Sequence, residues 1–221
     1  MIKEMRAENP AAVDTMGAHC LRDTKATENE QAFQTLVGLM LSSQTKDEVT
    51  SATMNYLIKE KGLSIVMIMK TSEKDLNEYI SAVGFHNKKA KYIKDTTKII
   101  VEKYKGVVPK ILDHLLDFPG VGPKMAHLLL QISFNQVEGI SVDTHVHRIS
   151  NRLKWVKKET LTPEKTASAL EDWLPQTHWG DINDLLVGFG QTICKPLRPQ
   201  CYRCKIKHLC PFTPKTVDKT P

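Results

Sequence analysis

The sequence predicts an all-α fold, and three observations support this. Apolar residues recur at helical spacing, as in Phe33, Leu36, Val37, Met40 and Leu41, which follow the i, i+3, i+4, i+7, i+8 pattern of one helix face. Helix-start signals recur along the chain. No period-two alternation bounded by hairpin turns is found. The 221 residues are enough for one large domain or two small ones.

The predicted helices are joined by short connections. Thr45 to Glu48 fits a capping box that opens the helix after Leu41. Ser72 is expected to cap a third helix carrying Leu76, Tyr79 and Ile80. In Thr162-Pro163 the proline stands at the first helical position. Further helices are predicted at 88–104, 111–116, 124–134, 144–153, 163–174 and 182–193.

The composition indicates a soluble protein that can bury a core, with 41% hydrophobic and 25% charged residues. The longest apolar stretches, 36–41 and 127–134, are far shorter than the ~20 residues of a membrane span. No apolar run follows the charged first residues, so no secretory signal is expected. A membrane partner is therefore not expected.

Positive charge is concentrated at the C-terminal end. Residues 194–221 contain seven basic residues and one acid, so the other 193 residues hold 24 of the 31 basic and 24 of the 25 acidic residues. A basic end on a neutral body indicates contact with a polyanion, above all nucleic acid. A solvated charged tail explains the charge alone equally well.

Four of the five cysteines lie together, spaced Cys194-x6-Cys201-x2-Cys204-x5-Cys210. Thiolates this close repel one another unless a cationic core holds them, and a disulfide scaffold would spread its pairs. By spacing alone, a structural zinc ion and an iron–sulfur cluster are equally compatible. Cys20 stands apart and is expected to be an ordinary thiol.

A turn of two glycines lies between two predicted helices. Pro119 and Gly120 end the first helix, Gly122 frees the backbone, and Pro123 starts the second. Outward-facing N–H groups at the start of the second helix would suit a phosphate. A tight turn without a ligand is the alternative.

Lys124 and Asp143 are the candidate catalytic pair. Lys124 falls near the second position of its helix, where the helix dipole disfavours a second positive charge and so favours the neutral, nucleophilic amine. Asp143 is expected at a helix N-cap. The helix at 124–134 is about 16 Å long, and the connection at 135–142 can reach back about 26 Å. The alternatives are a phosphate-binding surface lysine and an aspartate that only caps.

Together the glycine turn with its lysine, the run Val142-Asp143-Thr144-His145-Val146-His147-Arg148 and the cysteine spacing resemble the endonuclease III family, including its eukaryotic homologues. The likeness covers roughly residues 31–211. Phe118 stands where the family's helix-hairpin-helix motif usually has leucine, a change expected to affect packing only.

The resemblance implies a bifunctional DNA N-glycosylase and abasic-site lyase of base excision repair. Such an enzyme removes oxidised pyrimidines of the thymine glycol type from duplex DNA. Lys124 would attack C1′, expel the base and form a Schiff base, after which β-elimination breaks the strand. Asp143 would assist departure of the base and stabilise the cationic sugar. A [4Fe–4S] cluster would be held by Cys194, Cys201, Cys204 and Cys210.

The resemblance also implies a set of DNA contacts. Gln44 would fill the space left by the extruded nucleotide, with Ser42 near the pocket, and His145 would touch the flipped base. Phe85 aligns with a hydrophobic wedge position, and the alternative is that it is a core residue. For His145 the alternative is an ordinary residue on the helix surface. Backbone and phosphate contacts are expected from the remaining set, which comprises Gly120, Val121, Gly122, Arg203, Lys205 and Lys207.

By family analogy, residues 29–134 form a six-helix barrel with the hairpin at about 111–134. Residues 1–28 would join 135–221 in a cluster domain with its loop at 194–210, and duplex DNA would lie in the cleft between the domains. A monomer is expected, in the nucleus and with a mitochondrial pool. Two rivals remain open: an adenine glycosylase acting on mispairs, which usually lacks the hairpin lysine and has an extra C-terminal domain, and a non-catalytic DNA-binding scaffold with a zinc-stabilised tail.

Overall fold

The computed structural model describes residues 1–213, which fold into two compact units. The central unit comprises residues 16–138, and the terminal unit comprises residues 1–15 together with the chain from 139 onward. Lys215, Asp218 and Lys219 of the predicted basic end lie outside the described residues. Residues 1–213 contain α and 3₁₀ helices and no strand, which confirms the all-α prediction. None of their helices combines the length and hydropathy that crossing a bilayer requires.

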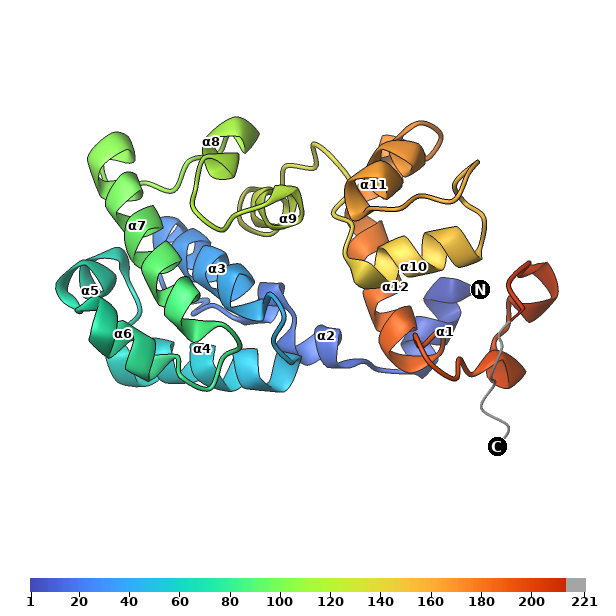
Figure 1. Cartoon of the computed structure of the whole chain (residues 1–221), viewed down its shortest axis with the longest axis horizontal. Coiled ribbons are helices and arrows are strands. Elements are labelled where there is room, and N and C mark those ends of the chain that lie inside the picture. The colour runs from blue at the N-terminus through green and yellow to red at the C-terminus, as the bar shows by residue number, and fades with distance from the viewer. Residues whose placement is uncertain (214–221) are drawn as a thin grey trace. The chain divides into compact units, whose positions relative to one another are not determined.

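The central unit is built around α3 (Glu28–Ser42), whose residues from Ala32 to Leu41 are all buried (Figure 1). Thr27 begins this helix with a capping box, because its hydroxyl accepts from the Glu30 amide while the Glu30 carboxylate accepts from the Thr27 amide. The other helices of this unit pack around α3 or on its neighbours. They are η1 (Ala18–Cys20), α4 (Asp47–Lys61), α5 (Ile65–Lys70), α6 (Glu73–Tyr79), α7 (His86–Tyr104), α8 (Leu112–Leu116) and α9 (Pro123–Phe134).

The terminal unit joins the two ends of the described chain. Arg6 of the first helix lies across Gly188, where a Cβ atom would collide with its guanidinium, and pairs with Asp14. The buried core of this unit includes Met5 from the N-terminal segment and Phe189 from the C-terminal half. Its helices are α1 (Ile2–Glu8), α2 (Ala12–Met16, across the boundary), α10 (Thr144–Arg152), α11 (Pro163–Glu171), η2 (Gln176–His178), α12 (Trp179–Thr192), η3 (Cys201–Arg203) and η4 (Lys207–Leu209).

The boundary predicted at residue 28 falls inside the central unit instead. Leu21 belongs to the core of that unit, Arg22 donates to the carbonyl of Ile132 at 3.0 Å, and the Asp23 amide donates to Gln34 at 2.7 Å. Residues 16–28 are therefore fixed to the central unit by contacts with α3 and α9 that the sequence pattern does not reveal.

Most predicted helix starts are correct, and one cap is wrong. Ser72 and Thr162 accept hydrogen bonds from the amides of Asp75 and Lys165, as expected of N-caps. The capping box predicted at Thr45 does not form, because α4 begins after Lys46 and no side chain caps it. The Thr45 hydroxyl instead takes part in a loop contact described below. Two later helices differ from their predicted bounds: α11 ends at Glu171 and not at 174, and α12 begins at Trp179 and not at 182.

Candidate functional site: a nucleic-acid interface and a cysteine-lined cavity

The glycine turn has the shape expected of a helix-hairpin-helix. Gly120 has φ +77°, and a Cβ atom there would stand 2.5 Å from the Tyr92 ring, so the position requires glycine in both conformation and space. Phe118 is buried and packs edge-on against Tyr104 with ring centroids 6.1 Å apart. The Val121 amide donates to the Phe118 carbonyl at 3.0 Å and closes the turn. The amides of Gly120 and Gly122 are thus better candidates than the amide of Val121 for contact with phosphate.

Lys124 lies at the second position of α9, as predicted, and is half-buried. The N-cap of this helix is Gly122, which has no side chain to bind the first N–H groups, and Pro123 at the first position has no N–H. The first turn contains no acid. The helix start therefore keeps its positive partial charge, which favours an anionic ligand there.

Asp143 is the N-cap of α10, as predicted. Its Oδ1 accepts from the amides of His145 and Val146, both at 2.8 Å, so the carboxylate has a fixed orientation. His145 is half-buried: its Nδ1 lies 3.2 Å from Arg148 Nη2, and a Cβ on Gly190 would meet its ring. Asp143 belongs to the terminal unit and Lys124 to the central unit. Their joint action on one nucleotide remains a prediction.

The loop between α3 and α4 presents Gln44 in a left-handed conformation, with φ +51°. The Ser42 hydroxyl donates to Leu39 of its own helix at 2.9 Å. Ser43, rather than Ser42, lines a cavity of about 230 Å³ beside Gln44, Phe85 and Gly120. Within the central unit, the loop, the predicted wedge and the hairpin therefore border one cavity.

Phe85 is the N-cap of α7 and also has a positive φ, +57°. Its side chain is 61% exposed, so the alternative that Phe85 is a core residue is wrong. The exposed Phe85 side chain lies at the same cavity as Gln44 and Gly120 and is available for contact. The wedge role of Phe85 stays a prediction.

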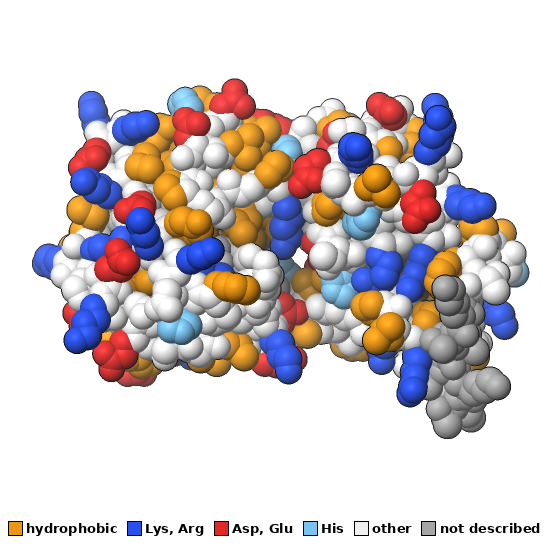
Figure 2. Space-filling view, viewed as in Figure 1, with side chains coloured by type: hydrophobic (Ala, Val, Ile, Leu, Met, Phe, Trp, Pro, Cys, Tyr) orange, Lys and Arg blue, Asp and Glu red, His pale blue; other side chains and the backbone are white. Residues whose placement is uncertain are grey.

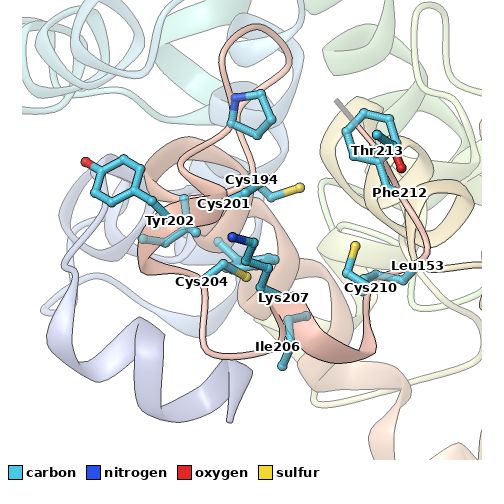
Figure 3. Close-up of a pocket in the computed structure, with 13 residues that line it drawn as sticks. Leu153, Cys194, Cys201, Tyr202, Cys204, Ile206, Lys207, Cys210, Phe212 and Thr213 are labelled. Carbon is cyan, nitrogen blue, oxygen red and sulfur yellow. The ribbon is translucent and has the colours of Figure 1, made fainter. Parts of the chain in front are cut away.

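The four C-terminal cysteines line a single cavity of about 610 Å³. In Figure 3 the sulfur atoms of Cys194, Cys204 and Cys210 point toward a shared space, with the Lys207 amine beside it. All four thiols are free, and none is fully exposed. Burial, followed by the charge of the neighbouring cysteines, raises the pKa of Cys201 and Cys204. Thiolates in this cavity therefore require positive charge, such as a metal centre would supply.

The geometry of the cavity bears on the choice between zinc and a cluster. A zinc ion needs four sulfurs about 2.3 Å from one point. Among residues 1–213, no group of three or more His, Cys, Asp or Glu side chains is close enough to hold one ion. A [4Fe–4S] cluster binds each cysteine at a different iron, so its four sulfurs stand farther apart. Four cysteines that line one cavity are a donor set used by both zinc sites and iron–sulfur clusters, so the choice of a cluster remains a prediction.

Basic residues from α10 surround the first cysteine. Arg152 Nη1 lies 3.4 Å from Cys194 Sγ, and Arg148 donates to the Cys194 carbonyl at 2.9 Å. Burial, then the charge of Arg152, lowers the pKa of Arg148. Figure 2 shows Lys and Arg side chains gathered on this face of the terminal unit, next to hydrophobic ones. This positive surrounding suits thiolate ligands.

Arg203 and Lys205 of the cysteine loop already have acceptors within the protein. Arg203 donates to Asn9, and Lys205 pairs with Glu8 and, at 4.0 Å, with Glu4. The hydrogen bond with Glu8 raises the pKa of Lys205. A phosphate would have to displace these groups, while Lys207 lines the cysteine cavity. Phosphate contact by the three residues remains a prediction.

Sequence reasoning missed Lys89, which is 7% exposed on α7. A signal was present, because Lys89 lies on the apolar face of the helix with Ile93, Thr96 and Ile100 at i+4, i+7 and i+11. A lysine on a buried stripe indicates a buried partner. Arg148 and Arg152 were also missed; they follow Asp143 on α10 at a spacing that places them on one side of the helix.

The comparisons with known proteins agree with this geometry. Residues 37–176 match the family described as HhH-GPD superfamily base excision DNA repair protein. Endonuclease III-like protein 1 of Gallus gallus is 52% identical over 210 residues, covering 95% of this chain and 74% of the relative. A solved non-covalent endonuclease III–DNA complex superposes with a TM-score of 0.80 at 27% identity, over 95% of this chain and 90% of the other. A trapped endonuclease III–DNA covalent intermediate gives 0.78 at 28%, over 96% of each chain.

Proposed function

Because the chain belongs to the HhH-GPD superfamily of base excision DNA repair proteins, as an endonuclease III-like DNA glycosylase, we propose that it removes oxidised pyrimidines of the thymine glycol type from duplex DNA and then cleaves the abasic strand as a lyase. The observation that carries this proposal is Lys124 at the second position of α9, directly after the hairpin. A trapped covalent complex of a structural relative with DNA supports the lyase step.

Lys124 Nζ attacks C1′ of the extruded nucleotide as the neutral amine. The bond from C1′ to the base breaks, and the base leaves with its electron pair and gains a proton. The nitrogen then loses a proton, the bond from C1′ to the ring oxygen breaks, and that oxygen takes up a proton as the protonated Schiff base forms. Loss of a C2′ proton expels the 3′ phosphate, and water releases Lys124. Proximity of the amine to C1′ supplies much of the rate enhancement.

Asp143 stabilises the positive charge that develops on the sugar as the base departs, and it relays protons in later steps. The two amides that bind its Oδ1 hold the carboxylate in place for this role. Held in this orientation, the carboxylate presents its negative charge to the cationic sugar.

The DNA is held at its backbone and opened at the lesion. The amides of Gly120 and Gly122 and the start of α9 bind phosphate, with Val121 anchoring the turn through its buried side chain. Gln44 enters the space left by the extruded nucleotide, and Phe85 wedges beside it. Ser42 and His145 contact the extruded base. Arg203, Lys205 and Lys207 add phosphate contacts, and the ion pair with Glu8 of α1 competes with the contact made by Lys205.

Cys194, Cys201, Cys204 and Cys210 would hold a [4Fe–4S] cluster. It would supply no bond-breaking chemistry, and the four cysteines that bind it would tie together the loop from Cys194 to Cys210. Arg152 beside Cys194 offsets the negative charge of the cysteine ligands. The protein acts as a monomer on duplex DNA in the nucleus, with a mitochondrial pool.

The reaction is tested with a duplex containing one thymine glycol in a labelled strand. We expect strand cleavage without alkali and, in borohydride, a covalent protein–DNA adduct. Lys124→Ala should abolish both while a gel-shift assay still detects binding. Base release that leads to strand cleavage only after alkali would show a glycosylase without lyase activity. A second duplex, with adenine opposite 8-oxoguanine, tests the adenine glycosylase alternative, and we expect no reaction on it.

A further inference from the structure

A buried lysine of α7 holds the loop that carries Gln44. Lys89 Nζ donates to the carbonyl of Leu41 at 2.8 Å, to the hydroxyl of Thr45 at 3.0 Å and to the carbonyl of Ser43. These acceptors lie on both sides of Gln44 in the chain. The lysine is therefore bonded to the end of α3 and to the loop that follows, and both belong to the central unit.

Burying the Lys89 ammonium costs free energy, which indicates that its charge does more than fill space in the core. Burial lowers the pKa of Lys89 to about 8, since a charge inside a protein loses its hydration. A methionine would fill the same space without that cost. The favourable contribution comes from the end of α3, where the last carbonyls lack helical partners and carry negative partial charge.

The opposite side of the loop is equally restricted. A Cβ atom on Gly84 would stand 2.8 Å from the Gln44 carbonyl oxygen, so the backbone before α7 presses directly on Gln44. The Lys89 amide also donates to the Phe85 carbonyl at 3.1 Å. This amide bond is the ordinary first bond of α7, whereas the Lys89 side chain holds the Gln44 loop from one side and Gly84 restricts it from the other.

We propose that Lys89 is a positioning residue for base extrusion, which fixes the Ser42–Thr45 loop so that Gln44 is aimed into the duplex. This rests on the proposed function of Gln44. Lys89 touches neither substrate nor reacting atoms and acts through Gln44. A loop free to move must be ordered each time DNA binds, and misplacement by about 1 Å can cost on the order of a hundredfold in rate.

The test is a double-mutant cycle between Lys89→Met and Gln44→Ala, with single-turnover base release from the thymine-glycol duplex as the rate. Each single change should slow base release by about 10- to 100-fold. In the Gln44→Ala background, Lys89→Met should cost less than about threefold, because the side chain it positions is gone. The control is Lys91→Met, which removes an exposed lysine from the same helix and should change the rate less than twofold.

A second readout follows the opening of the duplex directly. With 2-aminopurine opposite the lesion, insertion of Gln44 changes its fluorescence, and Lys89→Met should reduce that change while gel-shift affinity falls less than about fivefold. A fluorescence change in Lys89→Met as large as that of wild type would overturn the proposal. So would full additivity of the two rate effects, because a purely structural lysine would slow Gln44→Ala as much as wild type.

Two further outcomes separate the possible failures. If Gln44→Ala leaves base release unchanged, the proposed role of Gln44 fails, and the inference about Lys89 fails with it. If Gln44→Ala is slow and Lys89→Met is as fast as wild type, only the inference about Lys89 fails.

Should Lys89→Met not fold, Gly84→Ala decides instead, because its methyl group displaces the Gln44 carbonyl while Lys89 stays intact. It should slow base release at least tenfold, and a normal rate would refute positioning.

Discussion

Asp143 combines two roles in one side chain, because the carboxylate that caps α10 is also the proposed electrostatic partner of the sugar. Capping needs only an oxygen that accepts from the amides of His145 and Val146. Stabilising a cationic sugar needs a negative charge. The two roles can therefore be separated by a change that keeps the oxygen and removes the charge.

Asp143→Asn is that change, since asparagine caps helices as well as aspartate does. We expect base release to slow by about 10²- to 10⁴-fold, while the thermal unfolding midpoint stays within a few degrees of wild type. Single-turnover kinetics and circular dichroism measure the two effects. Thr162→Ala, which removes the cap of α11, is the matched control, with lower stability and normal chemistry. Near-normal turnover of Asp143→Asn would rule out its electrostatic role.

The hairpin shows how backbone geometry at one element fixes a binding surface. Gly120 needs both a left-handed conformation and the space beside Tyr92, whereas Gly62 at the end of α4 has φ +65° and no atom within 4 Å of a built Cβ. The two glycines therefore carry the same conformational demand and differ in steric demand.

Alanine at each position tests this difference by urea unfolding. Gly62→Ala should cost about 1 kcal/mol, from backbone strain alone. Gly120→Ala should cost about 2–4 kcal/mol, since the contact with Tyr92 adds to the strain. It should also weaken DNA binding, as its amide moves. Equal costs would show that Tyr92 yields readily and that the space beside Gly120 is not restrictive.

We propose that the first helix, α1, competes with DNA for Lys205 of the cysteine loop. Glu8→Gln removes the carboxylate that binds Lys205 and leaves the lysine available to phosphate. We expect DNA affinity to rise about two- to fivefold at low salt, with a steeper dependence on salt concentration. Glu102→Gln changes the net charge equally but lies on α7, paired with Lys98. A rise as large in that control would indicate a general charge effect and no competition at the loop.

At the scale of the whole molecule, the proposed cluster can be tested through its metal content, because the terminal unit encloses the cysteine cavity. The purified protein should absorb near 400 nm, as iron–sulfur proteins do, and contain about four irons per chain. Cys204→Ser should lower the iron content and the thermal midpoint. Zinc in place of iron, with no visible absorption, would contradict the cluster assignment and favour a single-ion site.

How much of this could be predicted from sequence depends on the range of the interaction. Local signals sufficed for the helical class, the caps at Ser72 and Thr162, and the place of Lys124 and Asp143 at their helix starts. Each of these depends on residues a few positions apart. The capping box at Thr45 failed because a lysine 44 residues away competes for the same hydroxyl.

Long-range contacts account for the other differences. Residues 16–28 join the central unit through Arg22 and Asp23, whose partners are 110 and 11 residues distant. The ion pair between Lys205 and Glu8 joins residues that are 197 positions apart in the sequence. Phe85 could have been core or surface by pattern, and only folding turned it to solvent. Pairings of this kind leave no periodic trace in a single sequence.

The proposed reaction depends on a covalent link between Lys124 and the sugar. Wild-type protein should be trapped with borohydride on a thymine-glycol duplex, digested, and the modified peptide sequenced by mass spectrometry. We predict that the residual sugar is attached to Lys124 alone, and that Lys124→Ala binds the duplex but yields no modified peptide. Attachment at another lysine, or an adduct that survives the substitution, would contradict the mechanism.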